Sequence, residues 1–88
     1  MNIQTVRALL EDSGVRKSHY VLYPDMYTAG ISHEALQVLP DGNYKVYAFD
    51  QGKRFNERIF ESEHDACMWF LRDGGFTKLY PKIAEAVQ

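Results

Sequence analysis

The chain has 88 residues, of which 45% are hydrophobic and 25% are charged, and its formal net charge is -2. These proportions are typical of a folded globular protein, and the length leaves room for one domain, residues 1–88, with a single modest core. The small negative charge argues against a general nucleic-acid binder, which needs a concentrated basic face. A single cysteine excludes an internal disulfide framework.

The N-terminal segment lacks a basic start followed by an apolar stretch. No run in the sequence approaches the roughly 20 consecutive apolar residues of a membrane span. We therefore expect a cytoplasmic protein with no membrane partner. Aromatic residues form 14% of the chain, a high share for so few residues, and aromatic side chains are enriched both in cores and at the centres of protein interfaces.

The first expected element is an amphipathic helix, which Gly14 ends as a C-terminal stop. Its apolar residues recur at helical spacing: Ile3, Val6, Leu9 and Leu10. A short β-favouring run follows at 19–23 and ends at Pro24, which predicts an edge strand and then a loop through Gly30.

Two reversals predict an antiparallel meander of strands at 34–39, 43–49 and 54–60. The first reversal contains Asp41-Gly42, a pair that tolerates the positive φ of a tight turn, and the second is 50–52. The meander has three strands, or four if 19–23 joins the sheet.

A second helix is expected from Glu63, because Ser62 can cap its first turn and acidic residues suit the positive end of the helix dipole. Its apolar stripe is Ala66, Cys67, Phe70 and Leu71. Gly74-Gly75 ends this helix, and Pro81 suits the first turn of a short terminal helix through Ala86. The order predicts an α+β fold: an N-terminal helix, a three- or four-stranded antiparallel meander, a second helix and a short C-terminal helical tail.

Catalytic chemistry has little support in the sequence. Cys67 could act as a nucleophile with a histidine as its base, but it lies on the apolar stripe, where burial makes a thiol inert. His19 and His33 lack the paired spacing of a metal site, and His64 is expected to be a polar surface residue at the start of the second helix. The acids Glu61, Glu63 and Asp65 are explained by the helix dipole, and Gly74-Gly75 follows a helix instead of opening one. We expect no enzyme activity, no metal and no cofactor.

A binding surface is a better expectation. Alternation along 43–49 places Tyr44, Val46 and Ala48 on one face of the sheet and Lys45, Tyr47 and Phe49 on the other. Two short helices normally cover only one face, so the other is expected to expose an aromatic side chain beside charges. The candidate binding residues are Tyr47, Phe49, Arg54, Glu57 and Arg58. The alternative is that the tail from Phe76 folds over this face and makes it core.

One segment resembles small bacterial immunity proteins, the cognate inhibitors of polymorphic toxins and of contact-dependent growth-inhibition toxins. The resemblance lies in Val46-Tyr-Ala-Phe-Asp-Gln-Gly52, Phe60, Glu63, Ala66-Cys67 and Phe70, within residues 36–72. The chain departs from the pattern at Asp50-Gln51, where the family has an acidic-basic pair, and at Ala48, where an aromatic is common. The resemblance implies a protein that binds and neutralises the C-terminal domain of a cognate toxin, often a nuclease.

Two other functions are alternatives, the first of them because it has the same element order. One is a double-stranded RNA-binding domain, which grips phosphates through lysines at the start of its second helix. Here that position reads Ser62-Glu-His-Asp65, and acidic side chains repel phosphates. The other is a small enzyme or accessory ligand-binding domain with Tyr47, Glu57 or His64 in a pocket.

Overall fold

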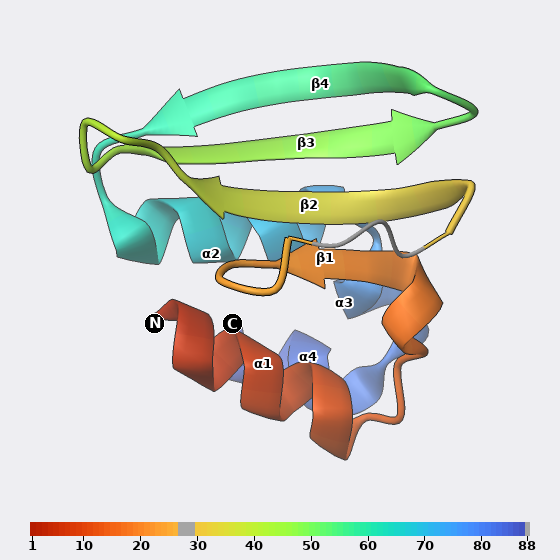
Figure 1. Ribbon diagram of the computed structural model, residues 1–88. Coiled ribbons are helices and arrows are strands. Elements are labelled where there is room, and N and C mark those ends of the chain that lie inside the picture. Colours follow the sequence, from red (N-terminus) through yellow and green to blue (C-terminus); the bar gives the residue numbers. More distant parts are fainter. Residues whose placement is uncertain (27–29, 88) are drawn as a thin grey trace.

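The structure, a computed structural model, describes residues 1–26 and 30–87. Its elements in chain order are α1 (Ile3–Asp12), the 3-10 turn η1 (Lys17–His19), β1 (Tyr20–Leu22), β2 (Ser32–Val38), β3 (Tyr44–Asp50), β4 (Lys53–Phe60), α2 (Glu63–Asp73), α3 (Phe76–Leu79) and α4 (Pro81–Ala86). Figure 1 shows a sheet packed against helices. The α+β class predicted from the sequence is confirmed.

The four strands lie in the order β1-β2-β3-β4. The predicted antiparallel meander is formed by β2, β3 and β4, whereas β1 is an edge strand that runs parallel to β2, with Val21 opposite Ala35. A parallel neighbour needs a longer connection than the tight hairpin that can join two antiparallel strands. The predicted loop through Gly30 includes residues 27–29, which lie outside the described residues.

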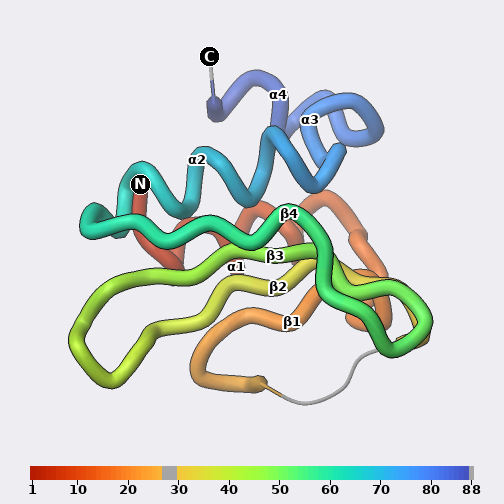
Figure 2. Tube along the Cα trace, turned by 90° about the horizontal axis from the view of Figure 1, so that it is seen from above, coloured from red at the N-terminus to blue at the C-terminus, as the bar shows by residue number. Residues whose placement is uncertain are grey.

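The helices all lie on one side of the sheet, as Figures 1 and 2 show from two directions. The predicted stripe of α2 is fully buried there, and α1, α3 and α4 add their own apolar residues to the same core. The tail does not fold over the second face, because Phe76, Ile83 and Val87 belong to this core on the helix side. The largest fully buried side chains are Phe70, Leu10, Leu22, Leu36, Leu71, Ile83, Val6 and Cys67.

The start of α2 is fixed by two contacts of its first turn. The Ser62 hydroxyl accepts a hydrogen bond from the Asp65 backbone N–H at 3.2 Å, which is the predicted cap. The Glu63 carboxylate accepts from the backbone N–H of Ile3 at 2.9 Å. This acidic residue therefore joins the first turns of α1 and α2, in addition to complementing the dipole of its own helix.

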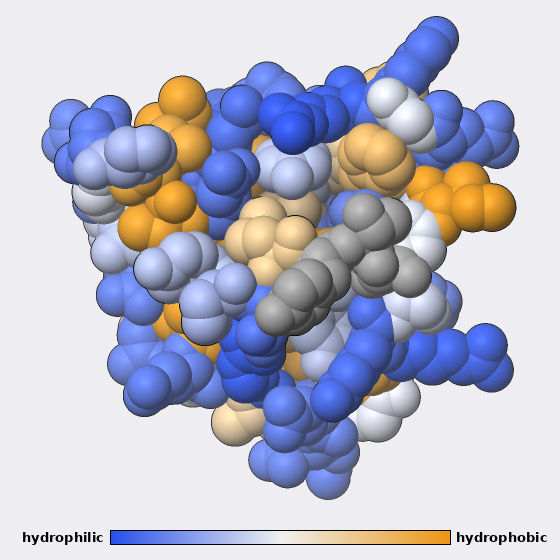
Figure 3. All heavy atoms as spheres, in the orientation of Figure 1, coloured by the Kyte–Doolittle hydropathy of each residue, from blue (hydrophilic) through white to orange (hydrophobic). Residues whose placement is uncertain are grey.

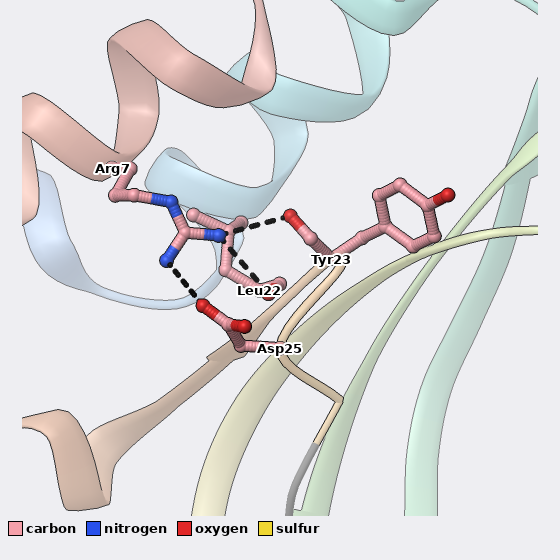
Figure 4. A network of polar contacts seen from close by, with 4 residues as sticks. All are labelled: Arg7, Leu22, Tyr23 and Asp25. Atoms are coloured by element: carbon pink, nitrogen blue, oxygen red, sulfur yellow. Dashed lines mark hydrogen bonds and ion pairs between the residues drawn. The ribbon is translucent and has the colours of Figure 1, made fainter.

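Arg7 links α1 to the end of β1 through hydrogen bonds (Figure 4). One guanidinium nitrogen donates to the carbonyl oxygens of Tyr23 at 3.0 Å and Leu22 at 3.3 Å, while the other contacts the Asp25 carboxylate at 3.2 Å. Because a planar guanidinium can donate in several directions at once, this one side chain supplies hydrogen bonds to the carbonyl oxygens of the turn that follows β1.

Replacing Arg7 with methionine keeps most of the apolar stem and removes these donors. We expect Arg7→Met to lower the free energy of unfolding by about 1–3 kcal/mol, because two hydrogen bonds from a charged group to backbone carbonyls are lost, and the one to Leu22 is partly buried. Asp25→Asn is expected to lower it by only about 0–1 kcal/mol, since the Asp25 side chain is 58% exposed. Urea unfolding measures both values, and equal losses would contradict the dominant role of the two carbonyls.

Candidate functional site

The sheet face opposite the helices, here called the open face, carries a second and smaller apolar cluster. Val21, Ala35 and Tyr47 are buried in it, and Met26 and Phe49 pack against them. The predicted alternation of β3 is therefore confirmed, since Val46 lies in the main core and Tyr47 does not. The expectation that an aromatic ring is freely exposed is not met at Tyr47, which is only 7% exposed, and Phe49 is half-buried.

Arg54 covers the ring of Tyr47. Its guanidinium carbon lies 4.8 Å from the ring centroid, a cation–π geometry that shields the aromatic face from water. The Arg54 side chain is itself 53% exposed. A partner that approaches the open face therefore meets the Arg54 guanidinium, with the Tyr47 ring as its support.

A carboxylate lies between two cations on the same face. Glu57 is 3.5 Å from the Lys45 ammonium and 3.9 Å from the Arg54 guanidinium. Such partly exposed pairs add little stability, typically about 0–1 kcal/mol each. Their effect is to limit the orientations of three charged side chains. With the exposed Ile59, which pairs with Lys45 across the strands, they form what we call the β4 surface: Lys45, Arg54, Glu57 and Ile59.

A β-bulge in β4 decides which side chains reach this surface. The register between β3 and β4 shifts opposite Tyr47, and Asn56 adopts a left-handed conformation with φ of 54°. In a regular strand Arg54 and Glu57 would point to opposite faces, but the extra residue of the bulge brings them to the same one.

The sequence predicts Arg58 on the same face as the other four candidate binding residues, but the structure has it on the opposite face. Beyond the bulge it pairs with the buried Val46, and its guanidinium carbon lies 4.5 Å from the centroid of the Trp69 ring of α2. It therefore lies on the helix side of the sheet. Asn56 is the one signal in the sequence for this change of face. Asparagine adopts the left-handed region more readily than most other residues, and Asn56 stands in the middle of the predicted strand.

The edge strand β4 is unusually exposed to solvent. Every residue of β4 from Lys53 to Ile59 is exposed, including the apolar side chains of Phe55 (46%) and Ile59 (61%). Figure 3 shows a largely hydrophilic surface in which apolar side chains form small separate patches. Exposed charged and apolar side chains thus occur together along one edge strand, an arrangement suited to protein recognition.

The residues considered for catalysis do not form a reactive group. Cys67 is fully buried, and burial together with the charge of Glu63 raises the pKa of its thiol to about 12. The thiol therefore remains protonated and unreactive at neutral pH. His64 lies exposed at the start of α2. Within residues 1–26 and 30–87, no three metal-ligating side chains come together.

No protein-family model matches the chain, and no curated protein or solved structure matches it significantly. None of the helices in the described part of the chain has the length and apolar character needed to cross a membrane.

Asn56 offers a test of the bulge. Asn56→Val is expected to lower the free energy of unfolding by about 1–2 kcal/mol or more, because a β-branched residue is strained in the left-handed region. Asn56→Gly is expected to remain close to the original stability, since glycine adopts this conformation freely. Urea unfolding compares the two variants, and equal stabilities would show that the bulge does not depend on the conformation of this residue.

Proposed function

We propose that the chain is an immunity protein that acts in the cytoplasm by binding and neutralising the toxic domain of a cognate bacterial toxin. The observation that carries the binding function is the β4 surface, where an exposed guanidinium, a carboxylate held between two cations and an exposed apolar side chain meet on one edge strand. Arginine on a supporting aromatic ring is a residue type that often dominates binding energy at protein interfaces.

The β4 surface is organised before any partner arrives. Its side chains stand on paired strands, and Arg54 is held by both Tyr47 and Glu57. Side chains that are already ordered lose less conformational entropy on binding, which favours tight association. Two cations surround one carboxylate, so the contacting surface of the partner is expected to be more acidic than basic, and the association rate to fall with added salt.

The class of partner is supported by the resemblance to immunity proteins. Its shared positions are mainly scaffold positions, because Val46, Ala66, Cys67 and Phe70 are buried. The departure at Asp50-Gln51 lies at the turn between β3 and β4, where Gln51 has a φ of 50°. The contact residues Arg54 and Glu57 lie outside the shared pattern, which fits a family in which each interface is adapted to its own toxin.

A double-stranded RNA-binding function has less support. The start of α2, where phosphate-binding lysines would be needed, carries Glu63 and Asp65, and the Glu63 carboxylate is already engaged with the backbone N–H of Ile3. Phosphate groups would be repelled at this position.

The test begins with the neighbouring gene, which is expected to encode a toxin whose toxic domain kills cells unless this chain is co-expressed. In the purified complex, Arg54→Glu is expected to weaken binding about 10- to 100-fold, because it reverses the central charge of the β4 surface. Binding is measured by calorimetry or by surface plasmon resonance.

Lys82→Glu is the matched control, since it makes the same charge change at an exposed position of α4 and should alter the affinity less than about threefold. If the neighbouring gene encodes no toxin and co-expression rescues no cells, the immunity function is wrong. If Arg54→Glu and Lys82→Glu bind equally well, the interface lies elsewhere.

A further inference from the structure

A cleft of about 270 Å³ opens at the end of the sheet where β2 begins and β3 ends. Its walls come from η1, the two strands, the turn between α2 and α3, and α3 itself, so segments far apart in the sequence close around it. This volume is slightly below the roughly 300–1,000 Å³ of typical small-molecule sites. The cleft therefore suits one small functional group with a short stem.

The walls of the cleft are largely apolar. On the helix side of the sheet the wall is formed by Ala48 and by Phe76, whose ring stacks on Phe70 with the centroids 5.3 Å apart. His33 and Phe49, which also border the cleft, stack at 4.9 Å on the open face, away from Glu34. Leu79 belongs to the lining and is 74% exposed, which leaves an apolar rim in contact with water. A ligand with methylene groups would bury both its own apolar surface and this rim.

Glu34 provides the charge inside the cleft. Its side chain passes close to Gly74, where a Cβ atom would lie only 3.1 Å from the Glu34 Cγ and 2.6 Å from the Phe70 carbonyl oxygen. The absence of a side chain at position 74 thus leaves room for this carboxyl. None of the ion pairs formed among the described residues includes Glu34.

The surroundings of Glu34 favour its neutral form. Burial, with repulsion from the Asp73 carboxylate, raises the pKa of Glu34 to about 7. The other titratable groups around the cleft are His19 on η1, His33 on β2, Asp50 on β3 and Tyr80 after α3. No described lining residue is a lysine or an arginine. A carboxylate that lacks a permanent cation can bind one supplied from outside.

We propose that this cleft binds an organic cation, an ammonium or guanidinium group on a short apolar stem, whose charge pairs with the carboxylate of Glu34. The stem lies along the Phe76 ring and the rim at Leu79, on the helix side of the sheet. The cation stabilises the ionised carboxyl, so binding releases the proton that Glu34 carries in the free protein. The site lies apart from the β4 surface, and this proposal does not depend on the identity of the toxin.

The sign of the pH dependence follows from this exchange. Below about pH 7 the free carboxyl is mostly protonated, and each bound cation must displace that proton. The apparent affinity is therefore expected to rise by up to about tenfold per pH unit toward pH 7 and then to level off.

The test is an NMR titration of the full chain with n-butylguanidinium, with n-butylurea as an uncharged probe of the same shape. We expect saturable shifts of backbone amides at 33–34, 48–50 and 74–76, at least tenfold tighter binding of the guanidinium than of the urea at pH 8, and weaker binding of the guanidinium at pH 6. Equal binding of the two probes, or shifts scattered over the acidic surface, would overturn the proposal without any variant being needed.

Glu34→Gln removes the charge but copies the shape of the protonated side chain, so it should fold normally, bind n-butylguanidinium as weakly as n-butylurea, and lose the rise in affinity between pH 6 and pH 8. Asp41→Asn is the matched control, because it makes the same charge change at an exposed position in the turn between β2 and β3. Retention of the pH dependence in Glu34→Gln would show that another group binds the cation.

The source of the cation is settled by adding the toxic domain to the chain saturated with n-butylguanidinium. Displacement of the probe identifies a basic side chain of the partner as the natural ligand, whereas retention of the probe identifies a free small molecule. The result is also separable from the proposed function, since Arg54→Glu can abolish toxin binding while leaving the binding of n-butylguanidinium unchanged.

Discussion

Burial of the apolar stripe of α2 against the sheet is the interaction on which the remaining structure depends. Ala66, Cys67, Phe70 and Leu71 have no exposed surface, and the strands beneath them contribute Leu36 and Val46 to the same core. Because the other helices also pack on this side, the open face must protect its apolar residues with its own polar side chains. The contact of Arg54 with Tyr47 meets that need and at the same time presents a cation to a partner.

The bulge at Asn56 divides the charges of β4 between the two faces. It brings Glu57 to the face of Arg54, and it turns Arg58 toward the Trp69 ring of α2. One backbone conformation thus determines the composition of the β4 surface. A bulge on an edge strand also interrupts the regular ladder of unpaired backbone groups, which limits unspecific strand pairing while the side chains stay available for a specific partner.

Local signals in the sequence were sufficient for the α+β class, because Ser62, Asp41-Gly42 and the stripe of α2 act through neighbouring residues. Two features depend on contacts between distant residues and could not be predicted: the parallel pairing of β1 with β2, and the cleft around Glu34, which forms where the turn between α2 and α3 meets the sheet. The placement of Arg58 depends on the left-handed conformation of Asn56, for which the asparagine is the one local signal. The toxin as partner comes from resemblance and remains a proposal.

Hydrogen exchange of backbone amides tests the central claim, recognition of a protein partner through β4, most directly. The measurement compares the free chain with its complex with the toxic domain encoded beside it. The account predicts slower exchange in residues 53–60, where the outer edge of the sheet is free, and unchanged exchange in α4, residues 81–86. Protection confined to α1 and α4, with β4 exchanging as fast as in the free chain, would contradict it.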